Sequence, residues 1–289
     1  MTGARAADPQ AARVSPGIWL ALPAAIWMTI GFVVPVVFLI VSGLFGTGLF
    51  GGEAASIATF VDVLGDPYYL GVIGNTLLYS TSVTLICLVI AYPFALALVR
   101  LPGWAQAVGM IVTLLPLTAS AIVKTFGITI LFRTTGVVNK TLQFLGIIDA
   151  PIRMLFTVPG LYLGTANMML PFMILPIYAA LRRIDPALGD AAATLRSGPF
   201  DRFLRVTLPL SLPGVFAGFA MVFALVASAY VMPTLLIGER HKVLSKTIAH
   251  AFLVTNDPAK GTVLALLLLA LCSGMVLFAA RVSRTGSTR

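Results

Sequence analysis

The sequence predicts an all-α, polytopic membrane protein with six transmembrane helices. Of its 289 residues, 59% are hydrophobic and only 10% are charged, and the mean hydropathy is +1.01. A soluble domain carries about 25% charged residues, so this chain has too few charges to cover its surface in water. Six stretches are long enough to cross a hydrocarbon core, which takes about 20 apolar residues. They are continuously apolar and lack the alternation of membrane barrel strands, which favours helices.

The expected spans follow one another with no second domain between them. They cover residues 18–45, 71–99, 105–131, 159–181, 208–237 and 261–280. We expect residues 1–17 to form a cytoplasmic N-terminal segment, residues 18–280 the six-helix membrane domain, and residues 281–289 a cytoplasmic tail. Basic residues before the first span resemble the start of a signal peptide, but this span is longer than a signal peptide's apolar region. It is therefore expected to remain as an uncleaved anchor.

The placement of lysine and arginine predicts that both termini are cytoplasmic, because cytoplasmic loops near span ends are enriched in these residues. With this orientation, eleven Lys or Arg residues lie inside, seven lie outside, and Lys124 lies within a span. The formal net charge of +9 is accounted for by this arginine excess, so no nucleic acid partner is expected. We expect a multi-pass protein of the cell (inner) membrane, surrounded by the lipid bilayer.

No catalytic or metal-binding motif is found in the sequence. Cys87 and Cys272 fall inside expected spans and predict neither a disulfide nor a metal site. His241 and His250 lie in or near an outside loop, with no carboxylate or cysteine cluster beside them. A nucleotide-binding glycine loop and the common hydrolase motifs are also missing. We therefore expect no enzyme activity, no cofactor and no metal, and any energy from ATP would have to come from another polypeptide.

Prolines interrupt the expected spans. Eight fall within them or at their edges: Pro23, Pro35, Pro93, Pro116, Pro171, Pro176, Pro213 and Pro233. A proline inside a helix removes one backbone hydrogen bond and bends the helix. Membrane helices also tolerate proline in static structures, but eight together favour a protein that changes shape around a cavity.

A few polar and aromatic side chains inside the spans are candidates for a substrate path: Asn75, Lys124, Tyr162, Asn167 and Tyr230. An unpaired lysine at mid-depth costs about 2.5–3.5 kcal/mol on insertion scales. Lys124 is therefore expected to face a cavity, to extend to an interface or to pair with another group. The tyrosines could attract a cationic cargo by cation–π contact or serve as packing residues and interface anchors, and both interpretations stay open. None of the expected spans contains Asp or Glu.

The most unusual segment is the charged stretch of residues 182–208, between the fourth and fifth spans. Asp185 followed by Pro186 is typical of a helix start, and Gly198 followed by Pro199 is typical of a helix end in which the glycine is left-handed. The next piece is amphipathic: Phe200, Phe203 and Leu204 are expected on one side, and Asp201, Arg202 and Arg205 on the other. The pattern predicts a short capped helix, a turn and a surface helix. An ordinary basic interfacial loop would have a similar composition.

The order of residues in this stretch resembles the cytoplasmic "EAA" loop of ABC importer permeases. In that loop an acidic residue and two alanines are followed by glycine and later by a Leu-Pro pair. Here Asp190-Ala191-Ala192 matches the start, Leu195 precedes the glycine position, and Leu208-Pro209 matches the end. Aspartate replaces the family glutamate, and Arg196 occupies the glycine position, with Gly198 two residues later. "GNTLLYS" at 74–80, "IVKTFGITILF" with "TTGVVNKTL" at 122–142, "APIRMLFT" at 150–157, "LPFMILPIYAALRRID" at 170–185 and "YVMPTLLIG" at 230–238 resemble the spermidine/putrescine-type subfamily.

The resemblance implies the fold and function of a type I ABC importer permease. Its partners would be cytoplasmic ABC ATPase subunits, a second and different permease chain, and a periplasmic or lipid-anchored solute-binding protein. The loop residues that would couple it to the ATPase are Asp185, Pro186, Asp190, Ala191, Ala192, Leu195, Arg196, Gly198, Leu208 and Pro209. The small-molecule substrate would be a polyamine or a related solute, with an anionic or zwitterionic cargo as a further possibility. The alternative is an ATP-independent secondary carrier or channel, which would be expected to carry a coupling carboxylate within a span.

Overall fold

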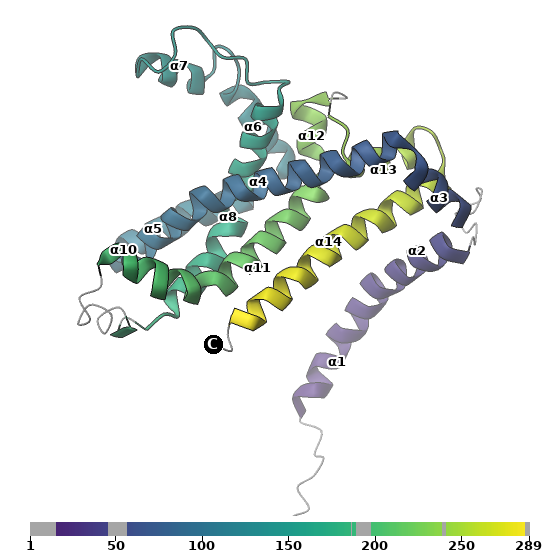
Figure 1. Cartoon of the computed structure of the whole chain (residues 1–289), viewed down its shortest axis with the longest axis horizontal. Helices are drawn as coiled ribbons and strands as arrows, with labels where there is room; N and C mark the ends of the chain where they lie inside the picture. Colours follow the sequence, from purple (N-terminus) through teal and green to yellow (C-terminus); the bar gives the residue numbers. More distant parts are fainter. Residues whose placement is uncertain (1–15, 46–56, 186, 189–197, 239–240, 287–289) are drawn as a thin grey trace, which may run out of the picture.

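The structure, a computed structural model, describes residues 16–45, 57–185, 187–188, 198–238 and 241–286, and all the regular elements in these ranges are helices (Figure 1). The first half contains α1 (Pro16–Met28), η1 (Thr29–Val33), α2 (Val34–Phe45), α3 (Ile57–Gly65), α4 (Pro67–Arg100), α5 (Gly103–Leu114), η2 (Leu115–Thr118), α6 (Ala121–Leu131) and α7 (Val137–Phe144). The second half contains α8 (Val158–Arg182), α10 (Pro199–Arg202), η3 (Phe203–Thr207), α11 (Leu208–Ala227), α12 (Val231–Leu236), α13 (Leu244–Leu253) and α14 (Pro258–Gly286).

Five helical stretches in the described part of the chain are long and apolar enough to cross a membrane. They are Leu22–Val41, Pro67–Arg100, Val158–Arg182, Pro199–Ala227 and Pro258–Ser283. The number becomes six when the bent pair formed by Gly103–Thr118 and Ala121–Leu131 is counted as one span. The predicted all-α membrane fold is thereby confirmed.

The third expected span, residues 105–131, is not one continuous helix, and this part of the prediction was wrong. Its two halves meet at an angle of 107°. The chain leaves the helix at Ala119 and Ser120, whose backbone is extended, and the Ser120 hydroxyl then accepts a hydrogen bond from the Ile122 N–H (3.3 Å). Lys124 therefore lies in the first turn of α6, beside the bend, and not at the middle of a continuous span.

The fifth expected span, residues 208–237, is also placed differently. The helix already begins at Pro199 and ends at Ala227, and α12 follows as a separate short helix. The π-helical turn η3 connects α10 to α11 immediately before Pro209. Pro209 has no N–H to donate to the preceding turn, and its ring crowds the carbonyl four residues earlier. A wider turn relieves this crowding, and the same arrangement occurs at η1, just before Pro35.

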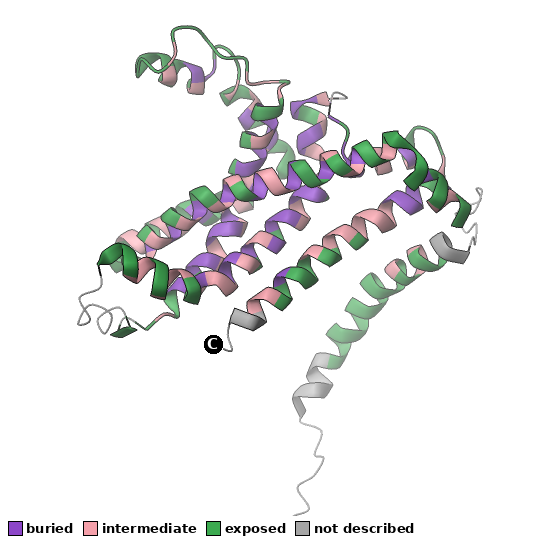
Figure 2. Cartoon of the chain, viewed as in Figure 1, coloured by how far each residue is buried: buried purple, intermediate pink, exposed green. Residues whose placement is uncertain are grey.

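The core lies between α4, α8 and α11, whose buried faces meet (Figure 2). Two glycines on α11 bring it close to α8. A Cβ atom on Gly214 would lie 2.5 Å from the Ala180 Cβ and 2.6 Å from the Pro176 carbonyl oxygen. A Cβ atom on Gly218 would lie 2.9 Å from the Met173 sulfur. Small residues one turn apart let membrane helices approach closely, so these two positions set the α8–α11 crossing.

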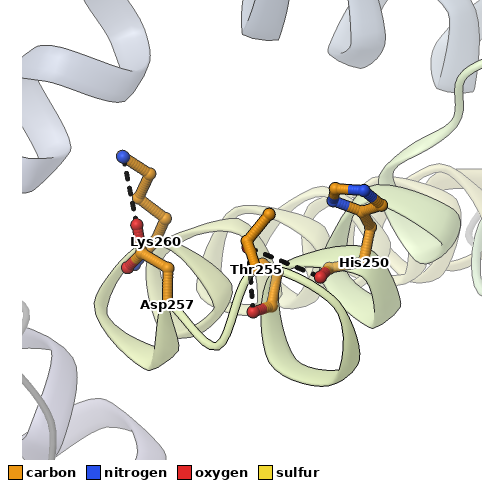
Figure 3. A network of polar contacts seen from close by, with 5 residues as sticks. His250, Thr255, Asp257 and Lys260 are labelled. Atoms are coloured by element: carbon orange, nitrogen blue, oxygen red, sulfur yellow. Dashed lines mark hydrogen bonds and ion pairs between the residues drawn. The ribbon is translucent and has the colours of Figure 1, made fainter.

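Two features lie outside this core. The segment α1–η1–α2 stands at the edge, where α2 contacts α14, and its described side chains are largely exposed (Figure 2). At the start of α14, polar contacts hold the corner after α13 (Figure 3). There Asp257 caps α14: its Oδ1 accepts the Lys260 N–H (3.0 Å), and its Oδ2 lies 3.0 Å from the Lys260 ammonium. Burial alone would raise the pKa of Asp257, but the hydrogen bonds from Lys260 outweigh it and lower that pKa.

Candidate coupling segment and substrate path

The charged stretch begins with the predicted helix cap. The Asp185 carboxylate accepts a hydrogen bond from the Ala187 N–H (2.9 Å), and the Leu188 N–H donates to the Asp185 carbonyl (3.1 Å). An aspartate in this position satisfies an N–H group that the first turn leaves free. Of the other residues expected to couple to an ATPase, Pro186, Asp190, Ala191, Ala192, Leu195 and Arg196 lie outside the described residues.

Gly198 does not have the left-handed backbone that the sequence predicted. Its φ is −63° and its ψ is 161°, and it occupies the N-cap position of α10. Pro199 is the first residue of α10, where the missing N–H of proline is tolerated because it has no helical partner. Gly198 and Pro199 therefore start the following helix. Leu208 and Pro209 lie inside the same continuous helix, at the start of α11.

The helix that follows Gly198 packs on α4 through Phe203. The rings of Phe203 and Tyr92 meet edge to face, with centroids 5.8 Å apart, and the Tyr92 hydroxyl hydrogen-bonds to the Ser211 hydroxyl (2.8 Å). The predicted apolar side is only partly correct, because Phe200 (71% exposed) and Leu204 (42% exposed) do not face the bundle. The contact to α4 makes this end of the helix a fixed element of the bundle.

A largely apolar groove lies beside the start of the charged stretch. Its volume is about 520 Å³, and it separates the end of α8 from the start of α11. Its lining includes Arg183, Asp185 and Leu188 on one side and Leu210 and Pro213 on the other. The groove therefore joins the capped residues of the charged stretch directly to the tight α8–α11 crossing.

The five residues expected on a substrate path fall into separate places. Asn75 is half-buried on α4, Lys124 is half-buried on α6, and Asn167 is exposed on α8. Tyr230 lines a pocket of about 250 Å³ together with Tyr68, Thr234, Lys242, Lys246, Thr247, Ala249, His250, Leu253 and Val254. Tyr162 belongs to a different cluster, next to α13. The described contacts thus give no single path through these five side chains.

Tyr162 belongs to a buried polar cluster that sequence reasoning missed. His241 is 9% exposed and contacts the rings of Tyr79 (5.9 Å between centroids) and Tyr162 (6.2 Å). The Tyr79 hydroxyl hydrogen-bonds to the Thr165 hydroxyl (2.8 Å), and His241 Nε2 has no hydrogen-bond partner among the residues that the structure describes. Burial, followed by the positive charge of Lys246, lowers the pKa of His241. The sequence did contain one signal of a buried polar face on α4, namely the helical spacing of Thr76, Tyr79, Ser80 and Thr84. All four residues are buried.

Comparisons with known proteins give a consistent picture. Residues 88–285 match the family described as "Binding-protein-dependent transport system inner membrane component". The chain is 30% identical over 261 residues to the spermidine/putrescine transport system permease protein PotB of Escherichia coli K12, covering 88% of this chain and 95% of PotB. It is 33% identical over 194 residues to PotB of Haemophilus influenzae, covering 67% and 68% of the two chains.

A more distant relative is named for a different cargo. The putative 2-aminoethylphosphonate transport system permease protein PhnU of Salmonella typhimurium is 26% identical over 283 residues, which are 96% of each chain. In fold, the chain resembles a bacterial ABC transporter that imports the acidic polysaccharide alginate, with a TM-score of 0.71 and 20% identity over 93% of this chain and 94% of that one. A second alginate transporter structure, in complex with an alginate-bound periplasmic protein, has a TM-score of 0.71 and 23% identity, with 93% of each chain covered.

Proposed function

Because this chain belongs to the family of binding-protein-dependent transport system inner membrane components, we propose that it carries a small polyamine, spermidine or putrescine, across the membrane. As a member of this family it is a multi-pass inner membrane protein and the translocation subunit of an importer, and ATP hydrolysis belongs to a separate subunit. The observation that carries the cargo proposal is the 30% identity to PotB over 88% of the chain.

The chemistry of the described helices restricts how such a cargo would be held. A polyamine is a flexible polycation, but α4, α5, α6, α8, α11 and α14 contain no Asp or Glu. Tyrosine faces can attract ammonium groups, with about 0.5–2 kcal/mol for each contact. Tyr162 and Tyr230 are the tyrosines proposed for this role, and acidic groups would come from a partner chain. Asn75 and Asn167 are proposed as neutral polar contacts, and Lys124 would repel a polycation if it lined the same path.

The cargo proposal is tested by uptake into vesicles that contain the assembled importer and its solute-binding protein. We expect ATP-dependent uptake of labelled spermidine or putrescine, which excess unlabelled polyamine abolishes and excess 2-aminoethylphosphonate leaves unchanged. Uptake of the phosphonate in place of the polyamines would overturn the cargo proposal. Uptake of either solute in vesicles without the ATPase would instead favour an ATP-independent carrier.

We further propose that residues 182–208 face the cytoplasm and couple the permease to the ATPase subunits. In this arrangement both termini are cytoplasmic, the second permease is a different chain, and a periplasmic or lipid-anchored binding protein delivers the cargo. The capped start at Asp185 and the contact between Phe203 and Tyr92 support the proposal, since a rigid element transmits a displacement that a flexible loop would absorb. The segment is anchored at both of its described ends.

The coupling proposal is tested with Ala192→Arg, which adds bulk and charge within the proposed docking residues. The variant is expected to reach the membrane at the normal level but to lose ATPase co-purification and uptake. Thr141→Arg makes the same type of change on α7, where the side chain is exposed, and should keep both properties. Normal uptake by the Ala192→Arg variant would contradict a coupling role for this stretch.

A further inference from the structure

The segment between α6 and α8 is organised around one asparagine. Asn139 is completely buried. Its Nδ2 donates to the carbonyls of Arg133 (3.1 Å) and Ile152 (2.9 Å), and its Oδ1 accepts the Ile152 N–H (2.8 Å). One side chain therefore fixes the backbone of Arg133 and the backbone next to Arg153.

Further hydrogen bonds and a close contact fix the rest of the backbone between Arg133 and Thr157. The Gly136 N–H donates to the Arg133 carbonyl (2.8 Å), and a Cβ atom on Gly136 would lie 2.3 Å from the Leu131 carbonyl oxygen. The Thr157 hydroxyl donates to the Met154 carbonyl (2.6 Å). Phe156 has a φ of 59°, which is uncommon for a residue other than glycine, and its N–H donates to the Leu236 carbonyl on α12 (3.0 Å). The backbone around the two arginines is thus fixed on every side by hydrogen bonds.

These walls enclose a pocket of about 300 Å³ that carries two positive charges. Its lining consists of Phe132, Arg133, Thr134, Thr135, Arg153, Met154, Leu155 and Phe156, without a carboxylate. Within the described part of the chain, neither guanidinium makes an ion pair or a hydrogen bond. Two exposed cationic side chains therefore line one pocket beside two hydroxyl groups, and neither has a counter-ion within the described part of the chain.

The pocket lies where the membrane spans end. Arg133 follows the last residue of α6, Leu131, by two positions, and Arg153 precedes the first residue of α8, Val158, by five. If α6 ends one membrane span and α8 begins another, as their length and composition predict, the pocket lies at the level of the phospholipid phosphates. Exposed apolar side chains adjoin the pocket on both flanks, including Ile130, Leu131 and Val158, and offer a surface for acyl chains.

We propose that this pocket binds the phosphate group of an anionic phospholipid. The planar guanidinium presents paired N–H donors that match phosphate oxygens, and the hydroxyls of Thr134 and Thr135 add neutral donors. Basic pockets at the ends of transmembrane helices attract anionic headgroups. A zwitterionic headgroup is disfavoured, because its ammonium group would be repelled by the same two arginines. This proposal does not depend on the identity of the cargo.

The test measures lipid retention by the purified complex of full-length permease and its partner chains. The complex is equilibrated with an equal mixture of phosphatidylglycerol and phosphatidylcholine, washed in detergent, and analysed for bound lipid by native mass spectrometry. We expect preferential retention of phosphatidylglycerol. Arg133→Gln and Arg153→Gln should each weaken its binding about tenfold, as expected for the loss of a charge-assisted hydrogen bond.

Lys140→Gln is the matched control, because Lys140 is an exposed cation in the same segment but outside the pocket. It should retain phosphatidylglycerol within about twofold of the unsubstituted protein. The proposal would be overturned if the arginine variants retained as much phosphatidylglycerol as the unsubstituted protein. It would also be overturned if the Lys140→Gln variant lost as much phosphatidylglycerol as the arginine variants. Displacement of phosphatidylglycerol by millimolar inorganic phosphate would overturn the lipid assignment in favour of a soluble oxyanion. Unfolding temperatures of all three variants verify that they fold.

Discussion

Asn139 illustrates how a single side chain replaces three backbone partners in a loop. The amide makes three hydrogen bonds to backbone groups of Arg133 and Ile152 while it is completely buried. A buried polar group without a partner costs about 1–3 kcal/mol. The arrangement of the loop therefore depends on this residue more than on any of the exposed side chains around it.

We expect Asn139→Leu to lower the free energy of unfolding by about 2–4 kcal/mol, because it removes the partner of the Ile152 N–H and of the Ile152 carbonyl, whereas the Arg133 carbonyl keeps the Gly136 N–H. Leucine has the same number and branching of side-chain heavy atoms as asparagine, so the variant removes the hydrogen bonds without shortening the side chain. Thermal unfolding of the detergent-purified protein measures it, and Lys140→Leu is the control on the exposed face of α7. Equal unfolding temperatures for the two variants would contradict the role assigned to Asn139.

His241 predicts a pH dependence. Because burial and Lys246 lower its pKa in the folded protein, the unfolded chain binds a proton more readily than the folded one. Its contribution to stability is therefore present above the ordinary histidine pKa of about 6.5 and is lost as the pH falls below it. Unfolding temperatures measured between about pH 7.5 and pH 5 should decrease less for His241→Phe than for the unsubstituted protein.

The exposed His250 provides the comparison. His250→Phe should retain the decrease in unfolding temperature toward acidic pH. If His241→Phe shows the same decrease as His250→Phe, the buried imidazole is not the group responsible.

Helix α11 meets α8 through backbone rather than through interlocking side chains. Gly214 leaves no space for a methyl group, because its Cβ would contact Ala180 and the Pro176 carbonyl. Gly71 on α4 differs, since a Cβ there would have nothing within 4 Å. The two glycines allow the same substitution to be compared at a crowded and an open position in transmembrane helices.

Gly214→Ala is expected to destabilise the protein by about 1–3 kcal/mol through overpacking, although alanine favours helices more than glycine does. Gly71→Ala should be neutral or slightly stabilising, by up to about 1 kcal/mol. Unfolding in denaturant, monitored by tryptophan fluorescence, measures both. A Gly214→Ala variant as stable as Gly71→Ala would show that the crossing can relax without cost.

For the whole molecule, the proposed orientation places α7 and α10 on opposite sides of the membrane. We expect a cysteine introduced by Lys140→Cys to react with a membrane-impermeant maleimide in spheroplasts. A cysteine introduced by Asp201→Cys should react only after the inner membrane is permeabilised. Both host positions are exposed, Cys87 is buried, and a Cys272→Ser background removes the half-buried thiol. The reverse labelling pattern would place the charged stretch outside and rule out its coupling role.

The sequence predicted the spans well because their length and apolar composition are local properties. Pro116 indicated a bend in the third span, but the sequence did not reveal that the chain leaves the helix there, because this break depends on the extended backbone at Ala119 and Ser120. The start of the fifth span was also missed. The charges of Asp201, Arg202 and Arg205 indicated a surface segment, although the helix continues through them.

The sequence predicted the candidate site correctly only where the structure depends on residues that are close together in the sequence. The cap at Asp185 follows from residues 185–187 alone and is confirmed. The contacts of His241 with Tyr79 and Tyr162 join three distant segments, and nothing local to any of them indicates the others. The conformation of Gly198 was wrong because glycine followed by proline is compatible with a helix end and with a helix start.

The close crossing at Gly214 divides the continuous helix from Pro199 to Ala227 into two arms. With a rise of about 1.5 Å per residue, about 23 Å of helix lies between Pro199 and the crossing, and about 20 Å lies between the crossing and Ala227. The two arms are therefore nearly equal in length. Because Phe203 and Ser211 tie the Pro199 arm to Tyr92 of α4, a displacement applied near Pro199 would move α4 and α11 together.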